Sequence, residues 1–235
     1  MPSNSAATSR ASAAPWRAGV ESAKRLAWPG LVLVAMAAGV VAAYYRVPAV
    51  HAALAQLAEW RAASGFAFSA GISALFAGFI PFLYLRLHPA TAAHHPWTHG
   101  GFFVLFWAYK GLEVDLLYRL QSRMFGDGTE VVTIAAKTAV DQLVYNPVWA
   151  APLAVILYGW KDAGFRWAAP LGDLRAPGWY LRRVLPVMIA VWGVWVPAVA
   201  CIYALPLPLQ LPLCCLVNCF WVILFSLITA RAPAR

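Results

Sequence analysis

The stretch VVTIAAKTAVDQLVYNPVWAAPLAVILYGW, residues 131–160, decides the class of fold to which this chain belongs. A helix needs about 20 apolar residues to cross a bilayer, so the stretch is long enough. A charged side chain at the bilayer centre costs about 2.5–3.5 kcal/mol on insertion scales, and charged groups at that depth face a bundle interior or a water-filled cavity. The stretch therefore predicts a membrane helix with a polar inner face. That face consists of Lys137, Asp141, Gln142, Asn146 and Pro147.

The composition predicts an all-α integral membrane protein, built as a polytopic helical bundle. Of the 235 residues, 62% are hydrophobic and 11% are charged, whereas a soluble domain carries about 25% charged residues. The net charge of +9 fits basic cytoplasmic loops that contact anionic lipid headgroups. No basic cluster is interleaved with aromatic residues in a polar segment, so we do not expect nucleic-acid binding. The expected partner is the lipid bilayer.

The apolar segments predict about six transmembrane helices in one domain, 26–230, with both termini cytoplasmic. In this arrangement 12 of the 18 Lys and Arg residues lie on the cytoplasmic side and 4 lie outside, as the positive-inside rule requires. If the charged third segment did not cross, the numbers of Lys and Arg on the two sides would be nearly equal. The third segment is therefore predicted to cross, although the sequence leaves open whether it crosses fully. The spans lie near residues 26–45, 66–85, 101–120, 131–160, 184–205 and 211–230, between a basic, disordered N-terminal tail (1–25) and a C-terminal tail (231–235).

Small residues recur at every fourth position in the first two predicted spans. Rows of this kind let the backbone of a neighbouring helix approach closely. We therefore predict two packing faces, with a narrow pore lining as the alternative. One row is Ala35, Gly39 and Ala43, and the other is Ser69, Ser73 and Ala77.

The charged residues of the third and fourth spans are the candidate functional residues. Lys137 and Asp141 lie four residues apart, so they share a helix face and are expected to pair. The third span carries Lys110, Glu113 and Asp115, which either line a cavity opposite that pair or lie in the membrane interface. Pro147 lacks an N–H and is expected to bend its helix. These groups either line a path through the membrane or form internal ion pairs that fix the helix register.

The remaining residue patterns predict neither a cofactor nor a catalytic site. Four cysteines lie in apolar segments near the C-terminus without metal-site spacing, as buried apolar side chains do. No phosphate-binding loop, nucleophile elbow or zinc-protease motif is present. We therefore expect no metal, no cofactor and no enzymatic activity. Four histidines crowd one loop, but without a nearby Cys or carboxylate they favour a solvated loop over a metal site: His88, His94, His95 and His99.

Two groups of residues form motifs. In the first, Lys137 is followed four residues later by Asp141-Gln142 and then by Pro147. The second lies in the last two spans and comprises Trp192, Trp195, Pro197, Pro206, Trp221 and Ser226. On these residues the chain resembles the Mpv-seventeen family, which includes the twenty-two-kilodalton peroxisomal membrane protein. It departs from the family where Val196 separates the Trp from the Pro and where Gln210 replaces an Arg.

The resemblance implies a role in transport or in membrane homeostasis. Family members are described as weakly selective channels for small solutes, or as proteins that support membrane and metabolite homeostasis. We therefore expect a conduit for small solutes or ions, with a non-conducting membrane scaffold or interaction protein as the alternative. A homo-oligomer is compatible with both. The expected location is a bacterial cytoplasmic membrane, with the mitochondrial inner membrane or the peroxisomal membrane as alternatives.

Overall fold

The computed structural model describes residues 15–230, with the side chains of residues 16, 17 and 19–224. Every regular element in this range is a helix, as predicted. Five helical segments are long and apolar enough to cross a membrane, as expected of an integral membrane protein. They are Gly19–Arg46, Pro48–Leu87, Val131–Asp162, Tyr180–Tyr203 and Leu207–Leu224.

Three of these segments are composite, because π-helical turns interrupt them. A π-helix bonds each N–H to the carbonyl five residues earlier and is therefore wider than an α-helix. The elements are α1 (Pro15–Arg46), α2 (Pro48–Ser73), π-helical η2 (Ala74–Phe79), α3 (Ile80–Leu87), the 3₁₀ turns η3 (Ala92–His94) and η4 (Trp97–His99), α4 (Gly100–Phe125), α5 (Val131–Val140), π-helical η5 (Asp141–Ala150), α6 (Ala151–Asp162), α7 (Ala168–Arg175), π-helical η6 (Tyr180–Val184), α8 (Leu185–Tyr203) and α9 (Leu207–Ala230).

Two predicted boundaries are wrong because helix continues into polar sequence. Residues 15–25, expected to be disordered, form the first turns of α1, while residues 1–14 and 231–235 lie outside the described residues. The second span, expected at 66–85, is preceded by helix from Pro48, and only Gly65 has non-helical angles within α2 (φ 55°, ψ −132°). Residues 48–64 contain many alanines, which have the highest helix propensity, so they remain helical despite their polarity.

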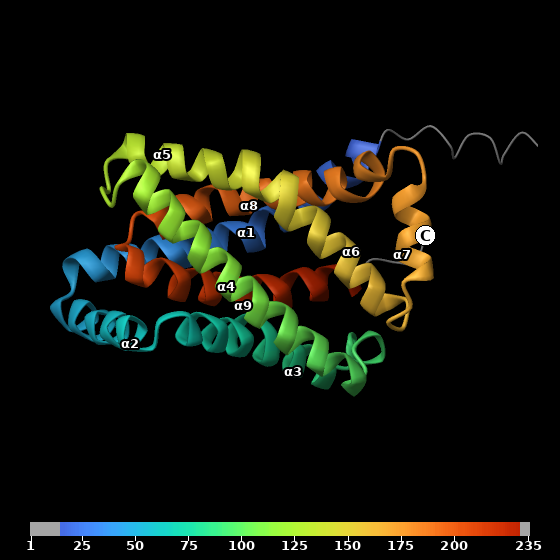
Figure 1. Cartoon of the computed structure of the whole chain (residues 1–235), viewed down its shortest axis with the longest axis horizontal. Coiled ribbons are helices and arrows are strands. Elements are labelled where there is room, and N and C mark those ends of the chain that lie inside the picture. Colours follow the sequence, from blue (N-terminus) through green and yellow to red (C-terminus); the bar gives the residue numbers. More distant parts are fainter. Residues whose placement is uncertain (1–14, 231–235) are drawn as a thin grey trace, which may run out of the picture.

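The long helices run between the two ends of an elongated bundle (Figure 1). At one end lie the turns that join α1 to α2, α4 to α5 and α8 to α9. At the other end lie the start of α1, the turns between α3 and α4, and helix α7. Helix α4 crosses the bundle obliquely and carries the chain from the α3 end to the α5 end, and α5 and α6 meet at an angle.

Helix α4 is not among the five segments that qualify as spans by composition. It is 26 residues long, which is enough to cross a bilayer, but it carries five charged residues. Hydropathy thus supports five of the six predicted spans. The sixth, α4, does not qualify by composition. The charged residues of α4 are Lys110, Glu113, Asp115, Arg119 and Arg123.

One of the two predicted small-residue faces is a packing face and the other is not. Ser69, Ser73 and Ala77 are buried where α2 and η2 pack against α4. Their counterpart on α4 is Gly111, where an added Cβ would collide with the Ser69 carbonyl and the Ser73 side chain. In α1, by contrast, Gly39 is exposed, because α1 packs on α8 through a different face. That face consists of Gly30, Leu33 and Ala37.

Candidate functional site

Three polar clusters lie along α4 inside the bundle, and together they form the candidate site. Each is built around one carboxylate that is buried or half-buried. We name them by that carboxylate. The Glu113 cluster comprises Lys110, Glu113 and Tyr145; the Asp115 cluster comprises Arg61, Ser69, Asp115 and Arg119; the Asp141 cluster comprises Gln121, Asp141, Gln142 and Tyr203.

The Glu113 cluster joins α4 to η5. The Lys110 ammonium forms an ion pair with Glu113 one turn further along the helix and donates to the Tyr145 hydroxyl at 2.7 Å. The Tyr145 hydroxyl in turn donates to the same oxygen of Glu113. The Lys110 ammonium also lies 5.1 Å from the centroid of the Tyr145 ring. The ammonium is thus neutralised and partly shielded from lipid.

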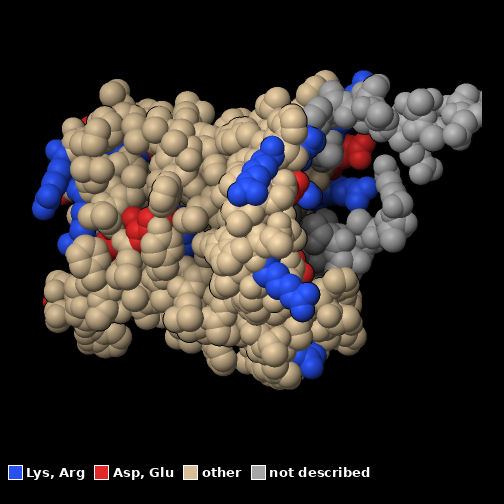
Figure 2. All heavy atoms as spheres, turned by 45° about the vertical axis from the view of Figure 1, so that its right-hand side comes forward, with Lys and Arg blue, Asp and Glu red and all other residues tan. Residues whose placement is uncertain are grey.

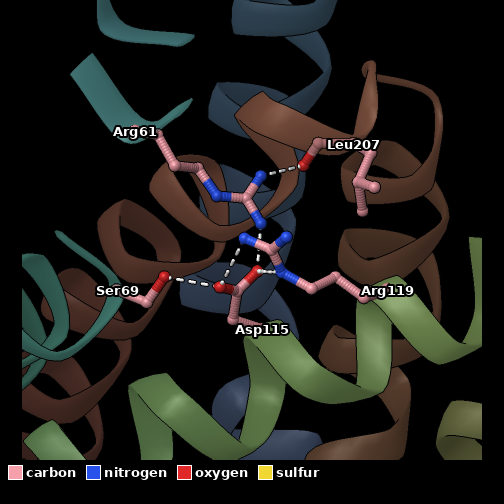
Figure 3. Close-up of polar contacts among 5 residues, drawn as sticks. All are labelled: Arg61, Ser69, Asp115, Arg119 and Leu207. Atoms are coloured by element: carbon pink, nitrogen blue, oxygen red, sulfur yellow. Dashed lines mark hydrogen bonds and ion pairs between the residues drawn. The ribbon is translucent and has the colours of Figure 1, made fainter. Parts of the chain in front are cut away.

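The Asp115 cluster joins α2, α4 and the start of α9 (Figure 3). Asp115 is 0% exposed and forms an ion pair with Arg61, which is 3% exposed. Ser69 donates to its second oxygen at 2.7 Å, and Arg119 donates to both oxygens at 3.2 Å. Arg61 also donates to the Leu207 carbonyl. One buried carboxylate therefore binds two guanidinium groups, the buried one of Arg61 and that of Arg119, whose side chain is 40% exposed.

The break in α2 lies between the two α2 residues that reach Asp115. Arg61 precedes Gly65 by four residues and Ser69 follows it by four. The φ of Gly65 is 55°, a value that glycine adopts without the steric cost of a side chain. The local sequence thus allows the helix to change direction where both side chains converge on one carboxylate.

The Asp141 cluster brings together α4, η5 and α8. Tyr203, the last residue of α8, donates its hydroxyl proton to Asp141 at 2.9 Å and accepts a hydrogen bond from Gln121 at 2.5 Å. Gln142 donates to the other oxygen of Asp141 at 2.9 Å. Tyr203 is 1% exposed, so its hydroxyl depends on these partners. It is the residue that holds this cluster together.

The predicted ion pair between Lys137 and Asp141 is wrong. Both side chains are buried as expected, but among the described residues Lys137 forms neither an ion pair nor a hydrogen bond. Its ammonium lies 5.8 Å from the centroid of the Tyr203 ring. The physical reason is that Asp141 opens the π-helical segment, where it binds uncharged donors of η5 and α8 instead of a cation on its own helix.

Pro147 removes one backbone donor inside η5, and α8 supplies a side-chain donor in its place. In a π-helix the N–H of residue 147 would bond the carbonyl of Gln142, but proline has no N–H. The indole N–H of Trp192 donates to that carbonyl at 3.1 Å. The Tyr180 hydroxyl donates to the carbonyl of Pro147 itself at 2.9 Å. Residues of the two sequence motifs are thus in direct contact.

The other motif residues have smaller roles in the structure. The rings of Trp195 and Trp221 meet edge to face, with centroids 6.1 Å apart. Pro197 lies within α8 and Pro206 lies between α8 and α9. Asn146 donates to the side chain of Gln142 at 3.4 Å, a long contact. The side chain of Ser226 lies outside the described part of the chain.

Beside the Glu113 cluster, the polar interior has room for about one water molecule. A cavity of about 20 Å³ is lined by Ser73, Trp107, Lys110, Gly111 and Asn218, together with apolar side chains and two cysteines. A buried water needs at least about 10–15 Å³ and two or more polar partners. A larger cavity of about 240 Å³, between α1, α2 and α9, has a wholly apolar lining. The cavity beside Lys110 is thus too small for a solute larger than water.

The predicted site residues are buried or partly buried but do not form one continuous face. The structure places five of them in the three clusters and leaves Lys137, Asn146 and Pro147 outside. It also adds residues that the sequence analysis did not select as site residues. Arg61 was assigned to a loop, although it lies in a run of alanines that indicates helix. Tyr203 is the last residue of an apolar segment, and no sequence pattern there indicates that its hydroxyl is buried. The added residues are Arg61, Ser69, Arg119, Gln121, Tyr145 and Tyr203.

No family model, curated protein or solved structure matches this chain. Among the described residues, no group of three His, Cys, Asp or Glu side chains could hold a metal ion. The class that fold and site define is a helical membrane protein with ionisable groups inside its bundle.

Replacing Tyr203 with phenylalanine should destabilise the protein by about 1–3 kcal/mol. The change removes the hydroxyl that serves Asp141 and Gln121 and leaves both buried groups short of a partner. The measurement is the free energy of unfolding in detergent. Tyr45→Phe is the matched control, since the Tyr45 hydroxyl donates to a carbonyl at an exposed position and should matter less. Equal losses in the two variants would contradict the role given to Tyr203.

Proposed function

We propose that the chain crosses the membrane six times with both termini in the cytoplasm, most simply in a bacterial cytoplasmic membrane. The connection made by α4 supports this topology, because the chain leaves α3 at one end of the bundle and enters α5 at the other (Figure 1). The charge distribution also supports it, since blue side chains lie toward the two ends while the surface between them is mostly tan (Figure 2). At the end of the bundle where α1 begins, the basic residues include Lys24, Arg86, Lys161 and Arg182.

We propose that the protein is a conduit for small solutes or ions. The observation that carries the proposal is the charged helix α4, whose ionisable side chains lie inside the bundle and contact the π-helical segment η5. Ionisable groups at membrane depth commonly mark solute paths and proton relays, and π-helical turns occur often at functional sites. Since the cavity beside Lys110 holds about one water molecule, passage of a solute requires the clusters to separate.

We further propose that the chain is a divergent member of the Mpv-seventeen family. The contact between Trp192 and the carbonyl of Gln142 supports this, because it joins the two motifs on which the resemblance rests. Channel function in that family is consistent with the conduit proposed for this chain.

One observation favours a second function, a non-conducting scaffold. Each carboxylate of the three clusters has hydrogen-bond or ion-pair partners within the bundle, as structural ion pairs would. A scaffold would use these contacts only to fix how the helices pack. Neutralising one of these carboxylates should change solute flux if the protein is a conduit, and only the free energy of unfolding if it is a scaffold.

Solute flux through the purified protein in liposomes tests the conduit. We expect Glu113→Gln and Asp141→Asn each to change potassium or chloride flux by about tenfold or more. A unit charge 4 Å from a passing ion contributes about 4 kcal/mol at an effective dielectric constant of about 20, and about 1.4 kcal/mol already corresponds to tenfold. Asp173→Asn, which changes an exposed ion pair on α7, serves as the control.

The result that would reject the conduit is flux no greater than in protein-free liposomes, from protein shown to be folded and inserted. The scaffold would then be favoured. It predicts that the substitutions change only the free energy of unfolding, with coupling between the partners of each cluster.

A further inference from the structure

Lys137 is a buried cation without a counter-ion in direct contact. Its side chain is 1% exposed, and its ammonium lies against the face of the Tyr203 ring. The Tyr203 hydroxyl donates to Asp141 and accepts from Gln121, and it forms no hydrogen bond with Lys137. The Lys137 ammonium therefore has no acceptor among the described residues.

The carboxylates of the bundle are engaged with other groups. Glu113 pairs with Lys110, and Asp115 binds two arginines. Asp141 accepts hydrogen bonds from Tyr203 and Gln142, and among the described residues it forms no ion pair. Lys137 is therefore the cation of this region that has no carboxylate in direct contact.

The position of Lys137 suits the entrance of a path. Lys137 lies about two helical turns after the start of α5, which follows the exposed turn that carries Asp127. On its inner side it meets Tyr203 and the Asp141 cluster. Two buried polar atoms in this part of the bundle, Gln121 Oε1 and Thr138 Oγ1, have no hydrogen-bond partner among the described residues. An unpaired cation and unused polar atoms thus lie between the exposed turn and the polar interior.

We infer that Lys137 selects small anions, such as chloride, phosphate or short carboxylates, as the solutes of the conduit. This inference rests on the proposed function. A buried charge without a partner is unfavourable, and an anion entering from the α4–α5 turn would compensate it. Where one sign of charge prevails, the local concentration of the opposite ion rises by about 10- to 1,000-fold. Asp127 in the exposed turn opposes the attraction of an anion to Lys137, so the lower end of this range applies.

The first test measures the chloride-to-potassium permeability ratio from the reversal potential of a KCl gradient across phosphatidylcholine liposomes. Wild type should prefer chloride, and Lys137→Gln should lower the ratio by about tenfold, at the lower end of that range. Lys137→Arg should retain the preference, since it keeps the charge. Arg123→Gln removes an exposed cation from the same end of α4 and should leave the ratio unchanged. An unchanged ratio in Lys137→Gln would overturn the inference while leaving the conduit in place.

A second readout does not depend on flux. Binding of inorganic phosphate to the folded protein raises its unfolding temperature, but phosphate also stabilises proteins generally by exclusion from their surface. The relevant quantity is therefore the difference between wild type and Lys137→Gln, with Arg123→Gln as the control. A larger shift in wild type, even without flux, would support the anion site and reject the conduit. Equal shifts in wild type and Lys137→Gln would reject the site.

Discussion

Replacing Asp115 with asparagine should destabilise the folded protein by about 3–5 kcal/mol. The substitution preserves shape but removes the negative charge between Arg61 and Arg119, and Arg61 is 3% exposed. Removing one partner of a buried ion pair typically costs this much, because the other charge remains buried without compensation. The free energy of unfolding in detergent is the quantity to measure.

Asp173→Asn is the matched control for this change. Its partner Arg183 has a side chain 58% exposed to solvent, and exposed ion pairs contribute at most about 1 kcal/mol. Combining Arg61→Met with Asp115→Asn should recover part of the loss, since the buried cation is then also removed. A cost for Asp115→Asn no larger than for Asp173→Asn would show that the cluster is not held together by charge.

Replacing Gly111 with alanine should cost about 3 kcal/mol or more, or prevent assembly. The new Cβ would collide with the Ser69 carbonyl and with the Ser73 side chain, so α2 and α4 would have to separate. Overpacking typically costs about 1–3 kcal/mol, and more where the obstacle is backbone. Separation would also disturb the contact of Ser69 with Asp115.

Gly101→Ala is the matched control on the same helix, because no atom lies within 4 Å of a Cβ added at Gly101. Alanine favours the helix more than glycine does, so the control should be neutral or slightly stabilising. Unfolding in detergent and the yield of monodisperse protein measure both variants. A neutral Gly111→Ala would show that α2 and α4 can move apart without cost.

Much of the fold can be predicted from the sequence, because lipid imposes a simple pattern on it. Long apolar runs predict the helices, and polar residues inside such a run predict an inward face, as for Asp141 and Gln142, both buried. The helix from Pro48 to Gly65 was missed, since its polarity resembles that of a loop while its alanines favour a helix.

The partners within the site could not be predicted, because they depend on which helices are neighbours. Spacing on one helix predicted that Lys137 would pair with Asp141, but the π-helical segment and the proximity of α8 brought Tyr203 to Asp141 instead. For the same reason Arg61 could not be connected with Asp115: α2 and α4 pack together only in three dimensions. Hydropathy predicts whether a side chain lies inside the bundle, but it does not predict which other side chain it contacts.

The hydrogen bond from Trp192 to the Gln142 carbonyl has a consequence for how this sequence can change over time. Proline at residue 147 removes the N–H that a π-helix would direct to this carbonyl, and the indole N–H of Trp192 donates to it. Losing the tryptophan first leaves the carbonyl without a donor. Losing the proline first introduces an N–H that competes with the indole. We therefore expect changes at the two positions to be coupled, so that sequences that descend from this one keep both residues or lose both.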